Sequence, residues 1–233
     1  MLKDDLGVVY VAWGDKGIAE AKESARSCQR FGLSTCLVTD ANTTVPDSCF
    51  DIVTVADFGD ENGNVPYSRK MYAYRESPFE KTLYLDSDCL MLFDPHQWFD
   101  FDRYHLAVAH APYPYFQWQR KHIIHFNTGV QFFVKCPEVD AFMLRWLELA
   151  DNFKTEFQKD QYGFSLAVHQ CRLRLLTLPY TCNYRAGLPG VTKCIQGPLY
   201  FWHSRLPVPK EVARYNAQFD DDRLNFKYMI LEG

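Results

Sequence analysis

Two aspartates with one residue between them, Asp86 and Asp88, directly follow a hydrophobic segment at 83–85. Residues i and i+2 of an extended chain point to the same face, and a bend at the end of a strand lets both carboxylates reach one ion. Two unpaired carboxylates in apolar surroundings repel each other and take up protons, whereas a bound divalent cation keeps both charged. The pattern therefore predicts a site for Mg²⁺ or Mn²⁺. Because a D-x-D pattern is short, the alternative that one acid caps a turn while the other is solvated stays open.

The segments before these aspartates predict the elements that position them. An apolar run at 6–13 predicts a strand, and apolar residues at three- and four-residue steps within 16–31 predict a helix. Further strands are expected at 33–38, 50–55 and 81–85. This alternation of strands and helices is typical of a parallel sheet.

The rest of the chain continues the alternation. A helix is predicted at 67–76, where the residue before Pro78 ends it, and 59–64 is a loop by composition. The later elements expected are strands at 105–110, 130–135, 173–178 and 199–202, helices at 137–149 and 158–170, and a terminal helix with a loop within 207–233. We interpret the chain as one α/β domain.

Composition excludes several classes of protein. The 233 residues are 47% hydrophobic and 23% charged, close to average globular usage, which excludes general disorder. The net charge of -4 and the lack of a basic block argue against nucleic acid as a partner. The eight cysteines form no C-x-x-C pair, which argues against a zinc knuckle and favours a reducing compartment. With no signal peptide and no membrane-spanning stretch evident, we expect a cytoplasmic protein without a transmembrane segment.

Five segments in order resemble the nucleotide-sugar glycosyltransferases of the GT-A fold. The likeness is greatest to glycosyltransferase family 8, the group of glycogenin and the bacterial galactosyltransferases. The segments are VVYVAWGD at 8–15, SPFEKTLYLDSD at 77–88, FNTGV at 126–130, KDQ at 159–161 and FWH at 201–203. The resemblance implies a single GT-A (Rossmann-like) domain over 1–233, with a mixed, mostly parallel sheet flanked by helices. Residues 1–93 would form the nucleotide-binding half and 94–233 the acceptor-side half.

The resemblance also implies an activity. The expected reaction is transfer of a hexose from a nucleoside diphosphate sugar, a UDP-sugar, to a glycan, glycoprotein or lipid-linked acceptor, with retention of the anomeric configuration. The implied metal ligands are Asp86, Asp88 and His203. A neutral imidazole added to two carboxylates favours Mn²⁺, with Mg²⁺ as the second choice. The ion would neutralise charge on the departing diphosphate.

The remaining site residues come from the matching segments and from positions near them in the expected fold. Asp160 and Gln161 would orient the sugar as the catalytic pair. Asp40 would accept a hydrogen bond from uracil or ribose, or would only cap a turn before Asn42. The family's K-P-W after the late histidine is absent, and Arg205 would supply the missing cation. The expected donor-binding residues are Val11, Ala12, Trp13, Asp40, Arg69, Lys70, Asp86, Ser87, Asp88, Asn127, Thr128, Gly129 and Arg205.

Ordinary structural roles for several of these segments also stay open. Arg69 and Lys70 fit a solvated helix face, and 127–129 fits a plain turn into the next strand. The aromatic stretch at 113–126 fits an acceptor-side wall or ordinary core packing.

Two other classes of protein share part of the pattern. A haloacid-dehalogenase-like phosphatase also places D-x-D after a hydrophobic strand, with the first aspartate as nucleophile and Mg²⁺ as cofactor. Its motif normally lies near the N-terminus and is followed by Thr or Val, whereas here it starts at Asp86 and is followed by Cys89. A catalytically silent module that binds sugar nucleotides or glycans is the other alternative.

Overall fold

A computed structural model describes most of the chain. The described residues are 5–46, 48–58, 66–99, 102–111, 124–152, 159–186, 193–219 and 228–231. The predicted loop at 59–64 lies outside them.

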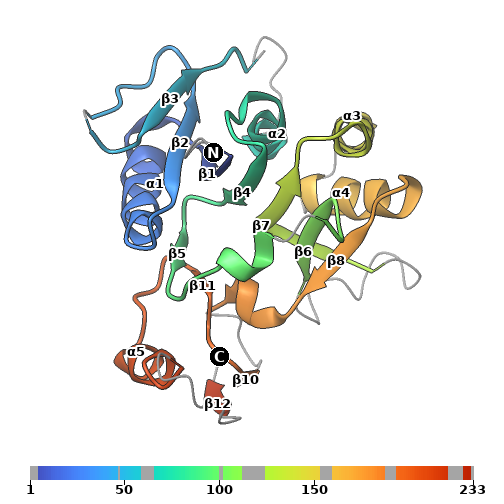
Figure 1. The fold of residues 1–233 in the computed structure, drawn as a ribbon. Coiled ribbons are helices and arrows are strands. Elements are labelled where there is room, and N and C mark those ends of the chain that lie inside the picture. The colour runs from blue at the N-terminus through green and yellow to red at the C-terminus, as the bar shows by residue number, and fades with distance from the viewer. Residues whose placement is uncertain are drawn as a thin grey trace.

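A seven-stranded sheet forms the centre of the protein (Figure 1). Its strands, in spatial order, are β3 (Ile52–Val55), β2 (Ser34–Thr39), β1 (Leu6–Val11), β4 (Lys81–Leu85), β7 (Phe126–Val134), β6 (Leu106–His110) and β8 (Leu175–Leu178). Strand β7 is antiparallel to both its neighbours, and every other pair in this sheet is parallel. The expected fold class, α/β with a mixed and mostly parallel sheet flanked by helices, is confirmed.

Both faces of this sheet are buried, because consecutive residues of each strand point to opposite sides. On β1, Val8 and Tyr10 join one hydrophobic cluster, which also contains apolar residues of α1 (Gly14–Gln29). Val9 points the other way and joins a second cluster. That cluster contains apolar side chains of α2 (Tyr72–Glu76), α3 (Pro137–Asn152) and α4 (Lys159–Gln170). The helices therefore form layers on both sides of the sheet.

The described residues also form two smaller sheets. Strand β5 (Cys89–Met91) pairs antiparallel with β11 (Phe201–His203), which pairs in parallel with β9 (Tyr184–Arg185). Strand β10 (Lys193–Gln196) pairs antiparallel with β12 (Tyr228–Leu231). The pairing of β5 with β11 joins the segment after β4 to the late part of the chain, as Figure 1 shows.

Several boundaries differ from the sequence predictions. The segment predicted as a helix at 67–76 begins as the 3-10 helix η2 (Pro66–Met71) before α2. Strand β7 begins four residues earlier than expected, so 127–129 is strand and not turn. Beyond 207 the expected helix is α5 (Lys210–Asn216), but β12 was not predicted, because its pairing with β10 is a tertiary contact. Two further 3-10 helices are η3 (His96–Phe99) and η4 (Tyr180–Asn183).

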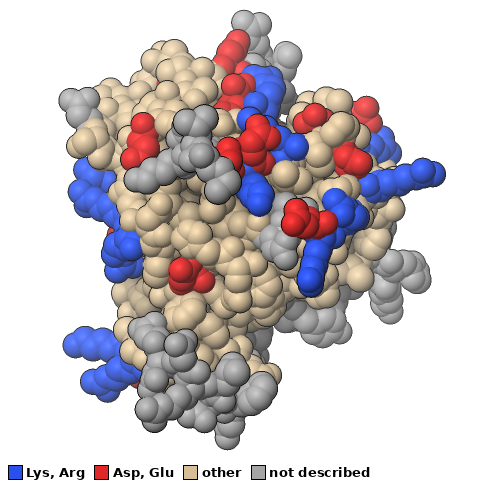
Figure 2. All heavy atoms as spheres, viewed as in Figure 1, with Lys and Arg blue, Asp and Glu red and all other residues tan. Residues whose placement is uncertain are grey.

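The surface on the face shown in Figure 2 carries acidic and basic side chains interspersed over a largely uncharged area. Within the described residues, no helix combines the length and the apolar composition that crossing a membrane requires.

Candidate active site

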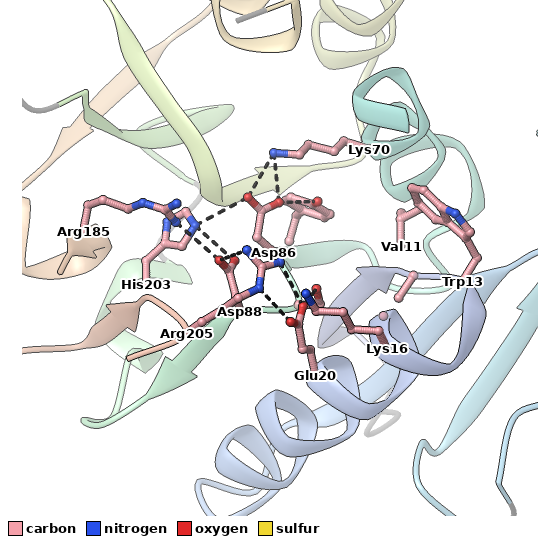
Figure 3. A pocket seen from close by; sticks show the side chains of 14 residues that line it. Val11, Trp13, Lys16, Glu20, Lys70, Asp86, Asp88, Arg185, His203 and Arg205 are labelled. Carbon is pink, nitrogen blue, oxygen red and sulfur yellow. Dashed lines mark hydrogen bonds and ion pairs between the residues drawn. The ribbon is translucent and has the colours of Figure 1, made fainter. Parts of the chain in front are cut away.

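A pocket of about 450 Å³ opens where the end of β1, the start of α1 and the turn after β4 meet β9 and β11. Figure 3 shows Lys70 reaching Asp86 from one side, Trp13 and Val11 at one end, and Arg185 and His203 at the other. The described residues that line the pocket are Val11, Ala12, Trp13, Lys16, Gly17, Glu20, Lys70, Tyr84, Asp86, Ser87, Asp88, Arg185, His203 and Arg205.

Asp86 and Asp88 lie in a tight turn between β4 and β5. The backbone N–H of Cys89 donates to the carbonyl oxygen of Asp86 over 3.0 Å, and the N–H of Asp86 donates to the carbonyl of Gly129 on β7 over 2.8 Å. The prediction that the acids lie on a bend is confirmed. The strand does not continue through them, since β4 ends at Leu85 and β5 begins at Cys89. The turn directs both carboxylates into the pocket.

His203 meets both aspartates from β11. Its Nε2 lies 3.3 Å from Oδ1 of Asp88 and 3.6 Å from Oδ2 of Asp86. These three groups all carry lone pairs, so a proton or a metal ion must lie among them to make the arrangement favourable. The spatial convergence that the sequence predicted for Asp86, Asp88 and His203 is therefore present in the fold.

Gly129 makes room for this convergence. A Cβ atom on residue 129 would lie 2.1 Å from Cε1 of His203 and 3.0 Å from Oδ2 of Asp86. Any other residue would fill the space that His203 and Asp86 share. The close approach explains why glycine occupies this position in the interior of β7.

Basic side chains surround the acids. Lys70 Nζ lies 2.9 Å from Oδ1 and 3.0 Å from Oδ2 of Asp86, and Tyr84 donates its hydroxyl to Oδ1 over 2.7 Å. Arg185 and Arg205 approach Oδ2 of Asp88 at 3.4 and 3.6 Å.

Glu20 of α1 links Arg205 to the aspartate turn. Arg205 donates to both carboxylate oxygens of Glu20, over 2.7 and 3.1 Å. Ser87 donates its hydroxyl to Glu20 over 3.3 Å. Glu20 therefore holds Arg205 at the edge of the pocket.

The surroundings shift the pKa values of Asp88 and Cys89 in opposite directions. Burial raises the pKa of the Asp88 carboxyl, but the hydrogen bond and charge of His203 and the charges of Arg185 and Arg205 outweigh it, so this pKa lies well below its usual range. Burial and the neighbouring aspartates raise the pKa of the Cys89 thiol well above its usual range. Asp88, Cys89 and His203 bring potential ligand atoms within 4.8 Å of one another. Of these, Asp88 offers a charged oxygen, whereas the thiol of Cys89 is held protonated.

Trp13 forms the other end of the pocket together with Val11 and Ala12. The guanidinium of Arg69 lies 4.1 Å from the centre of the Trp13 ring, a cation–π geometry, and 3.9 Å from Oδ2 of Asp40. Asp40 also accepts from the N–H of Asn42 and the hydroxyl of Thr43, over 3.0 and 2.8 Å. Neither Arg69 nor Asp40 is among the described residues that line the pocket. In this structure Asp40 caps a turn, and Arg69 packs against the ring of Trp13.

Asn127, Thr128 and Gly129 are buried in β7. Lys70 donates to the Thr128 hydroxyl over 3.3 Å, and the carbonyl of Asn127 accepts from Nδ2 of Asn183 over 3.2 Å. The sequence placed these three residues in a turn beside the sugar. The structure instead makes them part of β7, where they contact Asp86, Lys70 and His203. Their backbone is paired here because buried N–H and C=O groups need partners.

The Asp160–Gln161 pair begins α4. The carbonyl of Gln161 accepts from the Ser165 hydroxyl over 2.8 Å, and Gln161 is not among the described residues lining the pocket. The side chain of Asp160 lies outside the described part of the structure. The substrate-orienting role of this pair therefore stays a prediction.

Most of the aromatic stretch at 113–126 also lies outside the described residues. At its end, Phe126 is buried against Phe164 of α4, and His125 packs against Tyr162. These two members pack in the manner of core residues.

Sequence reasoning missed several residues of the pocket. Lys16 and Glu20 share one face of α1 at an i, i+4 spacing that could have indicated them. Arg185 and Asn183 gave no such signal, because the two-residue strand β9 and the 3-10 helix η4 have no periodicity to detect.

A second group of potential metal ligands, His105, Cys136 and Glu138, lies elsewhere. Arg174 places its backbone N–H 3.4 Å from Nδ1 and its Nε 2.9 Å from Nε2 of His105. Both ring nitrogens therefore face donors, which leaves this group without a free imidazole lone pair for an ion.

Comparison with known proteins gives a fold but no family. No protein-family model matches the chain, and no curated protein matches it. Among solved structures, the glycosyltransferase GlyE of Streptococcus pneumoniae TIGR4 is similar, at 17% identity with a TM-score of 0.54, over 78% of this chain and 47% of GlyE. Its apo form gives a TM-score of 0.55 over the same shares.

The chain therefore has the fold of a glycosyltransferase. It spans about half the length of the solved chain that it matches. It is an α/β protein in which acidic, basic and imidazole side chains gather in one pocket at the carboxyl end of β4.

Proposed function

We propose that this protein is a Mn²⁺-dependent glycosyltransferase that transfers a hexose from a UDP-sugar to a glycan, glycoprotein or lipid-linked acceptor. The observation that carries the proposal is the convergence of Asp86, Asp88 and His203 in one pocket of a glycosyltransferase fold. The fold similarity supports this class of enzyme over the phosphatase alternative.

The donor set fits a divalent ion of the manganese type. Two carboxylates and one imidazole bring oxygen and nitrogen ligands together, which favours Mn²⁺ over purely oxygen-seeking ions. The space that glycine leaves at position 129 is the space these ligands need. When bound, the ion supplies electrostatic stabilisation of the charge that develops on the departing diphosphate.

The chain's own residues would divide the remaining work along the pocket. Trp13 offers an aromatic face for the uracil ring at one end. Lys70, Arg185 and Arg205 surround the position where the diphosphate would lie, and fixed cations in a partly buried site stabilise developing negative charge. Asp160 and Gln161 would orient the hexose, with retention of its configuration.

Calorimetry with UDP in the presence and absence of Mn²⁺ tests the proposal. We expect Mn²⁺ to strengthen UDP binding, and Asp88→Asn to reduce the Mn²⁺-dependent affinity by about 100-fold. Asp94→Asn, which changes an exposed aspartate outside the pocket, is the matched control. Negligible UDP binding with and without Mn²⁺ would remove the proposal.

Turnover separates an enzyme from a silent binding module. Release of UDP from a panel of UDP-hexoses with Mn²⁺ present is the expected result for a transferase, since water can replace the acceptor slowly. Tight binding of every donor without any release, with and without candidate acceptors, would indicate the binding module instead.

A further inference from the structure

We propose that Lys70 occupies part of the metal-ion site in the ion-free protein, so that the divalent ion and the nucleotide diphosphate bind cooperatively. In this scheme the ammonium group of Lys70 leaves the Asp86 carboxylate and binds a phosphate oxygen when the ion and the diphosphate enter. The proposal rests on the function proposed above and concerns the regulation of that same site.

Lys70 is closely engaged with Asp86. Its Nζ contacts both oxygens of this carboxylate, at 2.9 and 3.0 Å, and the hydroxyl of Thr128 at 3.3 Å. The Lys70 side chain is only 15% exposed, which limits competition from water for these contacts.

Lys70 and a bound ion would compete for Oδ2 of Asp86. This oxygen is 3.6 Å from Nε2 of His203 and 3.0 Å from Nζ of Lys70. An ion held among Asp86, Asp88 and His203 would use this oxygen, because it is the one facing the imidazole. A divalent ion and an ammonium on the same oxygen repel each other strongly in a partly buried pocket.

Asp88 differs from Asp86 in this respect. It directs Oδ1 toward His203 at 3.3 Å, while Arg185 and Arg205 approach its other oxygen, Oδ2. Asp88 can therefore keep both arginines and still offer an oxygen to the ion. Lys70, in contrast, contacts both oxygens of Asp86, including the one that faces the imidazole, which singles out Lys70 as the competing cation.

The net charge of the pocket lining also disfavours binding of the ion alone. The described lining has four basic side chains, Lys16, Lys70, Arg185 and Arg205, and three acidic ones, Glu20, Asp86 and Asp88. An ion entering alone increases an existing positive excess. A diphosphate entering with it offsets the added positive charge and offers Lys70 a new acceptor, so each ligand favours the other by the same factor.

The test is a titration of Mn²⁺ followed by electron paramagnetic resonance, with and without UDP. For the unaltered protein, we expect UDP to strengthen Mn²⁺ binding by about 10-fold or more. Lys70→Met should strengthen the binding of Mn²⁺ alone by about 10-fold and reduce the effect of UDP to about threefold or less. A gain of metal affinity from a substitution in the pocket is a result that a merely structural lysine would not produce.

Lys16→Met is the matched control. It removes the same charge from the same pocket, and within the described structure no hydrogen bond or ion pair joins Lys16 to Asp86. We expect it to change the affinity for Mn²⁺ alone by less than about threefold, because only the general field changes. An equal gain from both variants would overturn the exchange and leave only general electrostatics.

The outcomes separate this inference from the proposed function. Unchanged or weaker binding of Mn²⁺ alone to Lys70→Met overturns the exchange while UDP–Mn²⁺ binding by the unaltered protein still supports the transferase. Absence of UDP binding by the unaltered protein removes the transferase itself. Circular dichroism checks folding, and Lys70→Gln, which keeps a polar group beside Thr128, carries the same expected gain if the methionine variant does not fold.

Discussion

The side-chain oxygen of Asn183 accepts a hydrogen bond from Nδ1 of His203 over 2.8 Å. Asn183 is fully buried on η4, and its amide nitrogen donates to the carbonyl of Asn127 on β7, which fixes the orientation of the amide. With the proton on Nδ1, the other nitrogen of the ring faces Asp86 and Asp88. Asn183 thus sets which imidazole nitrogen is presented to an ion.

Replacement of this amide should weaken metal binding. We expect Asn183→Leu to reduce Mn²⁺ affinity in the presence of UDP by about 10- to 100-fold, because the imidazole loses the partner that orients it. The measurement is a Mn²⁺ titration. Asn216→Leu, at a buried asparagine that bonds Leu199 and lies outside the pocket, is the control and should lower stability without this loss. Equal losses of affinity in both variants would contradict a positioning role.

Gly129→Ala should abolish the metal site. The added Cβ would lie 2.1 Å from Cε1 of His203, so the ring must leave its place between the aspartates. We expect Mn²⁺-dependent UDP binding to fall by about 100-fold or more. Gly17→Ala on α1 is the control for adding a methyl group, since its Cβ would meet Ala12 at an ordinary 3.8 Å. Retained metal binding in Gly129→Ala would show that His203 is not required at this place.

Trp13 should carry the affinity for the nucleobase. Stacking of a base on an aromatic side chain is worth about 1–3 kcal/mol, so we expect Trp13→Ala to weaken UDP binding by about 5- to 150-fold. Trp13→Phe, which keeps an aromatic face, should retain much of it. Calorimetry with UDP and with inorganic pyrophosphate separates base from phosphate, and a loss that is equal for both ligands would count against stacking.

Stability at alkaline pH should depend on Cys28. Burial raises the pKa of this thiol from 9.0 to about 12. Between these values the unfolded chain gives up a proton that the folded chain keeps, so the free energy of unfolding falls as the pH rises. One such group contributes up to ~1.4 kcal/mol per pH unit. The contribution is fully present below pH 9.

Urea unfolding under reducing conditions at several pH values above 9 measures this slope. Cys28→Ala removes the titrating group and should make the stability fall less steeply with pH than in the unaltered protein, whatever its effect at neutral pH. Parallel curves for the two proteins would show that Cys28 does not contribute to the alkaline loss.

Local patterns in the sequence were sufficient to predict the main sheet and the place of the acids. β1, α1, β2 and β4 have apolar spacing that matches their burial on the sheet, because strands covered on both faces are continuous hydrophobic runs. The acids follow the end of such a run, so their position at the carboxyl edge of the sheet was predictable. His203 was found through its likeness to a family segment and not through local spacing.

Other parts of the site depend on contacts that no local pattern contains. Asn127 and Gly129 are turn-forming types, yet pairing of β7 with β4 and β6 makes 127–129 strand. Arg185 enters the pocket because β9 pairs with β11, and Asn183 reaches His203 from η4. These placements arise from tertiary packing, which overrides propensity over short segments.

The pairing of β5 with β11 also has a consequence for synthesis of the protein. It brings Asp88 together with His203, although the two are encoded far apart along the chain. On the ribosome the aspartates emerge first, and the nascent polypeptide carries them without their imidazole or the arginine of β9. The pocket therefore stays incomplete until translation has passed β11 and that strand has paired with β5.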